Sequence, residues 1–296
     1  MKAPVQQRVA TLNEQQILVD TGFLREIDEI ANVSGKSPDE ARDYARACLE
    51  EMAVHPEDRY LDRIARLASF MYTRSYEPEL DVDVGELARL KELGREHPLV
   101  FLWSHKSHLD GFVFMRAIYD SDFRPQPLSF AGLNMAFAGL KTLGKRSGAI
   151  FLRRSFKDDE NYRLVFRHYI DYLVKMRVPL SWSIEGTRSR TGKLMPPKLG
   201  LIRWAIESYH RASCDDVLFV PVSISFDQIP EMDDYVAMQR GLPKRKESLG
   251  WFVSYISGMQ AHVGKIYLRY GEPLALSDAA SRLEGMFDAS GKPGHT

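Results

Sequence analysis

The sequence has 296 residues, of which 44% are hydrophobic and 27% charged, and its 40 Lys and Arg balance its 40 Asp and Glu. This composition is typical of a globular chain with a buried core, which argues against disorder as the main state, and the longest apolar runs are too short to span a bilayer. Cys48 and Cys214 are too far apart to suggest a disulfide framework, so a reducing compartment is expected.

The neutral total hides a basic band in the middle of the chain. Between Lys141 and Arg203 there are fifteen Lys and Arg and only five Asp and Glu, so the remainder carries the opposite excess. Such a band favours an anionic ligand or membrane headgroups as partner. Nucleic acid is not expected, because no basic repeat, zinc knuckle or aromatic RNA-binding motif accompanies these charges.

Residues 1–80 predict an N-terminal helical domain. Apolar residues recur at helical spacing within 57–74, and Ser37, Pro38 and Asp39 predict a helix start for 39–52. No catalytic pattern occurs in this part. The first residues contain neither an apolar core segment nor a small-residue cleavage site, so no signal peptide is expected.

Residues 81–280 predict an α/β domain, which we expect to be the catalytic one, and 281–296 a C-terminal tail. Short apolar runs alternate here with helical stretches, which favours a mostly parallel central sheet flanked by helices, with sites at strand ends. The candidate strands are 98–104, 127–131, 148–153, 178–184, 217–226 and 265–270. The clearest helices are 109–120, 159–177 and 197–212.

The sharpest local feature is WSHKSHLDG at 103–111, where His105 follows a strand and Asp110 begins the next helix. A tight turn can bring the carboxylate onto the imidazole, which fixes its tautomer and leaves the other nitrogen free to take a proton. Three other interpretations remain open. His105 can be a structural histidine, His105 with His108 and Asp110 can bind a metal, and Ser107 can be a nucleophile, although the glycine-flanked elbow of hydrolases is missing.

Two further blocks supply cations at strand ends. GAIFLRRSF at 148–156 places Arg153 and Arg154 where a phosphate can be bound bidentately, unless both are surface arginines in salt bridges. SIEGTRSRTGKL at 183–194 follows a strand with Glu185, Gly186, Arg188, Ser189 and Lys193. Gly186 permits a positive φ or a close backbone approach, and the loop suits a second anion site, unless it is simply a solvated charged loop.

The fourth block, VPVSISFDQ at 220–228, is a strongly apolar strand that contains Pro221. Because proline cannot donate a hydrogen bond to a ladder, it predicts an edge strand or a bulge. By itself the block indicates only core.

In this order and at these separations, the four blocks resemble those of the glycerol-3-phosphate acyltransferase superfamily. HKSHLD is similar to its H-x-x-x-x-D block, and GAIFLRRSF, IEGTRSRTGK and VPVSISF to the second, third and fourth. The wording is closer to the bacterial membrane-associated type and to dihydroxyacetone-phosphate acyltransferases than to lysophosphatidate acyltransferases. The resemblance covers about residues 95–276, including LRYGEPLAL at 268–276, and many relatives of the bacterial type are longer chains.

The resemblance implies acyl transfer from acyl-CoA or acyl-carrier protein to the sn-1 hydroxyl of glycerol 3-phosphate, with no other cofactor and no metal. His105 would be the base and Asp110 its orienting partner. Arg153, Arg154, Arg188 and Lys193 would bind the acceptor phosphate, Glu185, Gly186 and Ser189 would help position it, and Val220 and Pro221 would shape the acyl-donor site. Dihydroxyacetone phosphate and lysophospholipid are alternative acceptors; a thioesterase or a non-catalytic scaffold is a more remote alternative.

A lipid product implies contact with a membrane surface, and we expect a peripheral protein on the cytoplasmic side of the cell membrane. The stretch 244–259 places three cations beside four anchor side chains, a pattern typical of an interfacial anchor; the cations are Lys244, Arg245 and Lys246, and the side chains are Trp251, Phe252, Tyr255 and Ile256. A packed helix inside the domain is the other interpretation of this stretch, and for any one such stretch it is favoured.

Overall fold

The computed structural model describes residues 12–132, 140–153, 155, 158–189, 191–211, 214–232, 235–236, 240, 249–259 and 262–281. Within these residues one mixed sheet forms the centre, in the strand order β1-β7-β6-β2-β5-β3-β4, with β8 beside β6. The pairs β1–β7, β6–β2, β2–β5, β5–β3 and β3–β4 are parallel, whereas β7 and β8 pair antiparallel with β6. The predicted α/β class with a mostly parallel sheet is therefore confirmed.

All six predicted strands are present, and two very short strands accompany them. The strands are β1 (Asp81–Val82), β2 (Leu99–Trp103), β3 (Leu128–Gly132), β4 (Ala149–Leu152), β5 (Leu180–Ser183), β6 (Leu218–Phe226), β7 (Ile266–Tyr270) and β8 (Leu274–Ala275).

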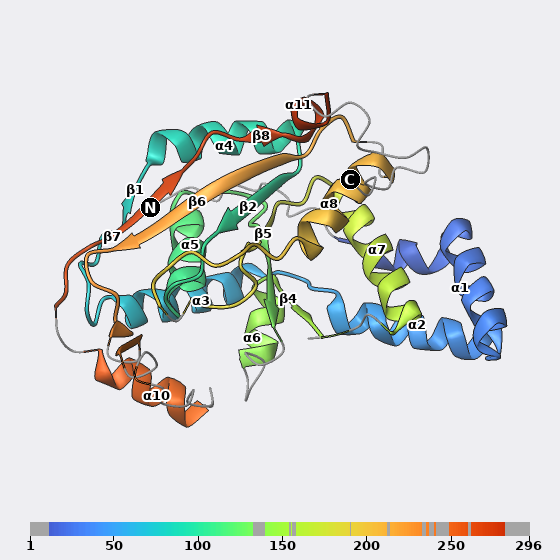
Figure 1. Cartoon of the computed structure of the whole chain (residues 1–296), viewed down its shortest axis with the longest axis horizontal. Helices are drawn as coiled ribbons and strands as arrows, with labels where there is room; N and C mark the ends of the chain where they lie inside the picture. Colours follow the sequence, from blue (N-terminus) through green and yellow to red (C-terminus); the bar gives the residue numbers. More distant parts are fainter. Residues whose placement is uncertain are drawn as a thin grey trace.

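The helices surround this sheet (Figure 1). They are η1 (Glu14–Val19), α1 (Thr21–Ser34), α2 (Pro38–Met52), α3 (Asp58–Tyr72), α4 (Val84–Glu96), α5 (Asp110–Asp120), α6 (Leu140–Arg146), α7 (Glu160–Lys175), α8 (Gly200–Arg211), α10 (Leu249–Gly258) and α11 (Leu276–Ser281). The predicted start of α2 is confirmed by a capping box, in which the Ser37 hydroxyl accepts from Glu40 N and the Glu40 carboxylate from Ser37 N.

Alternation along β2 shows how the layers are built. Leu99, Phe101 and Trp103 join a core cluster with α3, α4, α5 and α10, while Val100 joins a second cluster with α1, α2 and α7. Because successive side chains of a strand point to opposite faces, helices cover both faces of the sheet at β2. The carboxyl end of this central strand, at Trp103, leads through Ser104 to His105.

Pro221 does not place its strand at an edge, so the edge alternative is wrong, whereas the bulge alternative fits, because residues 220–221 of β6 face three residues, 271–273, of the segment between β7 and β8. β6 lies inside the sheet, with β2 on one side and β7 and β8 on the other. β8 pairs with Leu218 and Phe219, and β7 pairs from Val222 onward. Pro221 occupies the position between these two ladders, where its carbonyl accepts from Gly271 N at 2.8 Å. The proline is tolerated because the missing N–H falls where the partner strand is interrupted.

The N-terminal helices pack directly on the α/β part. Figure 1 shows α1 and α2 at the far right, with α7 between them and the strands, and residues of α1, α2 and α7 belong to one core cluster with β2 and β5. The division into domains near residue 80 remains a prediction, and the predicted tail lies outside the described residues apart from Ser281.

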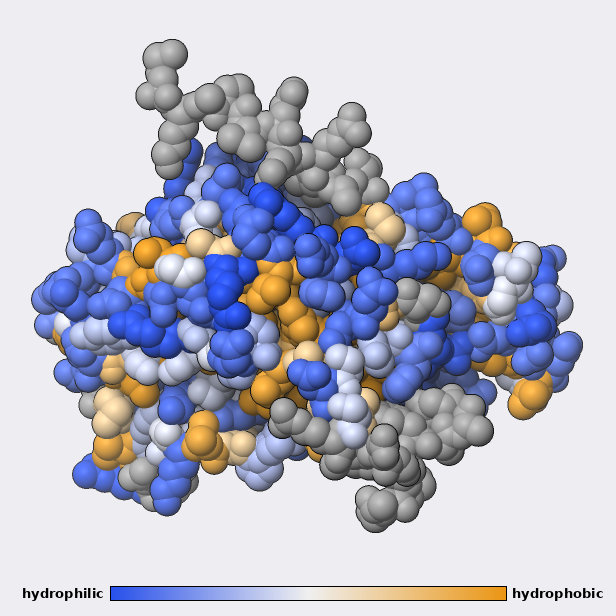
Figure 2. All heavy atoms as spheres, turned by 90° about the horizontal axis from the view of Figure 1, so that it is seen from above, coloured by the Kyte–Doolittle hydropathy of each residue, from blue (hydrophilic) through white to orange (hydrophobic). Residues whose placement is uncertain are grey.

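The surface carries both hydrophobic and hydrophilic side chains (Figure 2). From above, hydrophobic residues gather near the middle of the face and hydrophilic residues border them (Figure 2). Apolar atoms form more than half of an ordinary protein surface, so such patches do not identify a site by themselves. None of the described helices combines the length and the apolarity that crossing a membrane requires.

Candidate active site

His105 and Asp110 lie together in the turn between β2 and α5. His105 Nδ1 is 2.9 Å from Asp110 Oδ2. The Asp110 side chain is only 1% exposed, whereas the imidazole is 28% exposed. An ionised carboxylate only accepts hydrogen bonds, so Nδ1 carries the proton in this contact and Nε2 carries the lone pair. The turn therefore presents a partly accessible imidazole with a basic nitrogen.

Hydrogen bonds hold the backbone of this turn. Three of its amides donate to side chains of the turn itself, and one donates to Glu231. Asp110 Oδ2 also accepts from Lys106 N at 2.7 Å and from Ser107 N at 2.8 Å. The amide of His108 donates to Glu231 Oε1 at 2.7 Å, and that of Leu109 to Ser107 Oγ at 3.1 Å. All four amides between His105 and Asp110 are thus engaged, which fixes the turn in one conformation.

The loop after β5 lies against the same turn. β5 pairs with β2, so the carboxyl ends of the two parallel strands are neighbours, and Ser189 N donates to the His105 carbonyl at 2.7 Å. Ser189 is fully buried, and its hydroxyl donates to the Lys193 carbonyl at 2.7 Å. The sequence-predicted loop is therefore in direct contact with His105.

Gly186 and Glu185 shape the entry to this loop. Gly186 has φ +65°, and a Cβ there would lie 2.9 Å from Lys198 Cγ, so both expectations for this glycine are confirmed. Glu185 is 1% exposed, and its Oε1 accepts from Met195 N at 3.3 Å. Its carboxylate holds the far side of the loop rather than pairing with a cation in any described contact.

Arg188 is half-buried beside the turn, with its guanidinium 5.7 Å from the ring centroid of Tyr235. Tyr235 in turn donates its hydroxyl to the Lys106 carbonyl. Several buried polar atoms near His105 have no hydrogen-bond partner in the described structure, namely Asp110 Oδ1, Glu185 Oε2, Arg188 Nη1 and Glu231 Oε2. A guanidinium nitrogen without a partner, in the loop whose Ser189 contacts His105, suits an anionic ligand.

Comparison with known proteins assigns the family. Residues 82–225 match the family model described as "Acyltransferase", and residues 235–289 match that described as "Glycerol-3-phosphate acyltransferase C-terminal region". Proteins named "Putative acyltransferase plsB1" from Mycobacterium bovis and from two strains of Mycobacterium tuberculosis are 35% identical over 261 residues, 88% of this chain. The chain belongs to the glycerol-3-phosphate acyltransferase family. It spans about 41% of the length of these curated relatives.

In this family member, Arg153 is engaged away from His105. β4 lies three strands from β2, which at roughly 4.8 Å per strand separates them by about 14 Å across the sheet. The Arg153 guanidinium binds Glu51 of α2 through Nε at 3.1 Å and Nη2 at 2.6 Å, and Asp159 through Nη1 at 2.9 Å. It also stacks on the Tyr162 ring at 4.3 Å.

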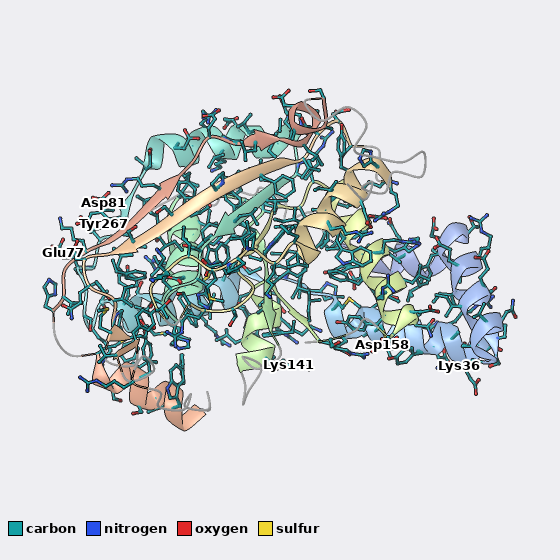
Figure 3. The ribbon with its side chains drawn as sticks, viewed as in Figure 1. Lys36, Glu77, Asp81, Lys141, Asp158 and Tyr267 are labelled. Carbon is teal, nitrogen blue, oxygen red and sulfur yellow. The ribbon has the colours of Figure 1, made fainter. Side chains whose placement is uncertain are left out.

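The loop after β4 is thereby tied to the N-terminal helices. The Tyr44 hydroxyl of α2 donates to Asp159 at 2.6 Å and accepts from Arg153 at 3.0 Å, and Figure 3 shows the neighbouring Asp158 beside α2. Arg154 lies outside the described residues. A phosphate-binding role for either arginine remains a prediction, and all three guanidinium nitrogens of Arg153 already donate to Glu51, Tyr44 or Asp159.

The remaining predicted residues occupy different surroundings. Lys193 is exposed in the loop that contacts His105. Val220 is fully buried in the core cluster on the α5 side, and Pro221 is exposed on the other face of β6. Their place in an acyl-donor site remains a prediction.

α10 packs inward in this acyltransferase family member. Phe252 and Ile256 are buried in the core, and Trp251 stacks on Tyr255 with the His108 ring 4.6 Å from Trp251. Val253 is 55% exposed. The three cations of the proposed anchor, at 244–246, lie outside the described residues. Two of the four predicted anchor side chains are thus core residues, which agrees with the packed-helix alternative.

Sequence reasoning missed Glu231, which the structure places against the turn. It lies after β6, is 2% exposed, and accepts hydrogen bonds from the turn through Oε1. Its burial and its contact with the turn come from tertiary packing. A single Glu in an acidic stretch of sequence indicates neither of them. Among the described residues, no group of three or more His, Cys, Asp or Glu side chains is placed to hold a metal ion.

Proposed function

We propose that this chain transfers a fatty acyl group from acyl-CoA or acyl-carrier protein to the sn-1 hydroxyl of glycerol 3-phosphate, giving lysophosphatidate. The observation that carries this proposal is the 2.9 Å contact between His105 Nδ1 and the buried Asp110 carboxylate, which would hold a proton on Nδ1 and leave Nε2 free to accept one. Family membership supports acyl transfer as the reaction class.

The reaction follows from this pair. Nε2 of His105 takes the proton of the acceptor hydroxyl as that oxygen attacks the thioester carbonyl. A new C–O bond forms, the tetrahedral intermediate collapses with cleavage of the C–S bond, and the imidazolium returns its proton to the departing thiolate. Asp110 stabilises the imidazolium while it exists. No acyl-enzyme is needed, because the hydroxyl and the thioester react directly.

The acceptor phosphate would be bound by Arg188, with Lys193 and Arg154 as further cations, and Glu185 and Ser189 would hold the loop that carries Arg188 and Lys193. Arg188 Nη1 is buried without a partner among the described residues, which supports this assignment. The oxyanion would be stabilised by donors outside the turn, because the amides from Lys106 to Leu109 already donate elsewhere. Val220 and Pro221 would border the donor site, and the enzyme would act as a peripheral protein at a membrane surface.

An acceptor panel tests the function. Purified protein is incubated with palmitoyl-CoA and glycerol 3-phosphate, dihydroxyacetone phosphate or lysophosphatidate, and free thiol and acylated lipid are measured together. We expect equal amounts of thiol and lysophosphatidate with glycerol 3-phosphate, and neither above background with His105→Ala. Preference for another acceptor would replace the substrate, and thiol release without any acceptor would indicate a thioesterase. Undiminished transfer by folded His105→Ala would refute the mechanism.

A further inference from the structure

Glu231 has no part in the reaction just described, yet it is one of the most buried carboxylates of the chain at 2% exposure. It follows β6, whose neighbour β2 leads into His105. Burying a carboxylate is costly unless hydrogen bonds compensate for the lost hydration. The burial of Glu231 therefore requires hydrogen bonds that compensate for it.

Those contacts converge on the turn that carries the base. Glu231 Oε1 accepts from the Ser107 hydroxyl at 3.1 Å and from His108 N at 2.7 Å. The Ser107 hydroxyl also accepts from Leu109 N at 3.1 Å. Glu231 thus binds the middle of the turn, while Asp110 binds its first half through Lys106 N and Ser107 N.

Two tyrosines extend the contact to the part of the chain that follows β6. The Tyr255 hydroxyl of α10 donates to the same Oε1 at 3.0 Å, and the Tyr235 hydroxyl donates to the Lys106 carbonyl. Burial raises the pKa of the Glu231 carboxyl, and hydrogen bonds from His108 N and Tyr255 together with the charge of Arg188 oppose that rise. The same guanidinium that faces the proposed phosphate site therefore also helps keep the carboxylate ionised.

We propose that Glu231 is a positioning residue that holds the Lys106–Leu109 backbone, and through it the His105–Asp110 pair, in the geometry that transfers the proton. It touches neither substrate nor the reacting atoms. Its effect on catalysis rests on the proposed function, whereas its effect on the turn does not. Loss of the carboxylate frees two donors of the turn, Ser107 Oγ and His108 N, together with the Tyr255 hydroxyl of α10, and a displacement of about 1 Å of a catalytic group can cost roughly 10²-fold in rate.

The test compares Glu231→Leu and Glu231→Gln with a matched control. Asp216 is also a buried carboxylate that accepts three hydrogen bonds, from Val217 N, Ser277 N and the Ser277 hydroxyl. It lies at the opposite end of β6 from Glu231, so Asp216→Leu reproduces the loss of stability away from the site. Titration calorimetry with glycerol 3-phosphate gives the fraction of each protein that is folded and binds.

We expect Glu231→Leu to lower kcat per binding-competent molecule by about 10²-fold while the acceptor KM changes by less than about threefold. Glu231→Gln keeps an acceptor oxygen and should stay within about tenfold of wild type. Asp216→Leu should leave kcat within about threefold. A kcat of Glu231→Leu near the wild-type value, a change in KM alone, an equal loss in Glu231→Gln, or an equal loss in Asp216→Leu would each overturn the proposal.

Hydrogen–deuterium exchange over 103–111 examines the turn itself. Glu231→Leu should speed exchange in this peptide, and Asp216→Leu should not. Unchanged exchange in Glu231→Leu would refute the positioning role whatever the activity. Wild-type protein that acylates no acceptor, together with faster exchange in Glu231→Leu, would refute the proposed function and leave the contact between Glu231 and the turn supported.

Discussion

Replacing Asp110 with Asn separates the charge of this side chain from its shape. Asp110 Oδ2 accepts three hydrogen bonds, from His105 Nδ1, Lys106 N and Ser107 N. The carbonyl oxygen of Asn can accept the same three, so Asp110→Asn should fold with the turn in place. It removes the negative charge that faces the imidazolium formed during proton transfer.

The structure sets the size of the effect. At 2.9 Å between Nδ1 and Oδ2, and with an effective dielectric constant of about 20, the attraction between imidazolium and carboxylate is roughly 6 kcal/mol. The Asn dipole retains part of it, so a loss of about 4 kcal/mol, or on the order of 10³-fold in kcat, is expected. Exchanging three charged hydrogen bonds for neutral ones costs about 3 kcal/mol of stability, which lowers Tm by roughly 6–12 °C.

Steady-state acyl transfer at saturating palmitoyl-CoA gives kcat and the acceptor KM, and calorimetric unfolding gives Tm. Asp216→Asn is the control, because it neutralises a buried carboxylate with three hydrogen bonds outside the site. It should lose stability and keep kcat. If folded Asp110→Asn retains kcat within about fivefold of wild type, the carboxylate does not assist His105 and the reasoning fails.

Three further substitutions test other parts of the site. Arg153→Ala should lower the free energy of unfolding, measured in urea, by about 2–3 kcal/mol, because it leaves Glu51 and Asp159 partly buried without their cation. A raised acceptor KM with unchanged stability would instead favour phosphate binding by Arg153. Arg188→Ala should raise the acceptor KM by roughly tenfold or more with a smaller change in kcat, and a KM within twofold of wild type would contradict the phosphate assignment. Gly186→Ala should cost about 1–2 kcal/mol because of its φ of +65° and the close Lys198 Cγ; thermal unfolding measures this against Gly200→Ala, where an added Cβ meets nothing within 4 Å, and equal Tm values would refute it.

The strands of the sheet were predictable where a run of apolar residues is long enough to indicate a strand. β2 is five apolar residues between Pro98 and Ser104, and a run that short and apolar is typical of a strand covered on both faces. β1 and β8 are two residues each, too short to show any periodicity. Pro221 left an edge strand and a bulge open, because the sequence around it does not show that the partner strand is interrupted there.

The candidate site was predictable where its members share one segment or directly follow strands of the sheet, as the loop with Ser189 does. His105 and Asp110 are five residues apart at a strand-to-helix turn, so local geometry already brings them together. Glu231 lies 124 residues from the serine it binds, and Glu51 lies 102 residues from Arg153. Contacts over such separations depend on tertiary packing, which no local pattern encodes.

The contacts of Arg153 bear on how small a working enzyme can be. The match to the acyltransferase model begins at residue 82, so a shorter protein for expression would be designed to start there. Yet Glu51 and Tyr44, both on α2, bind the guanidinium that follows β4. A fragment that starts at residue 81 would leave Arg153 and Asp159 without these partners, so the loop beside Arg154 would lose its anchorage. α2 therefore belongs to the minimal protein that we would express.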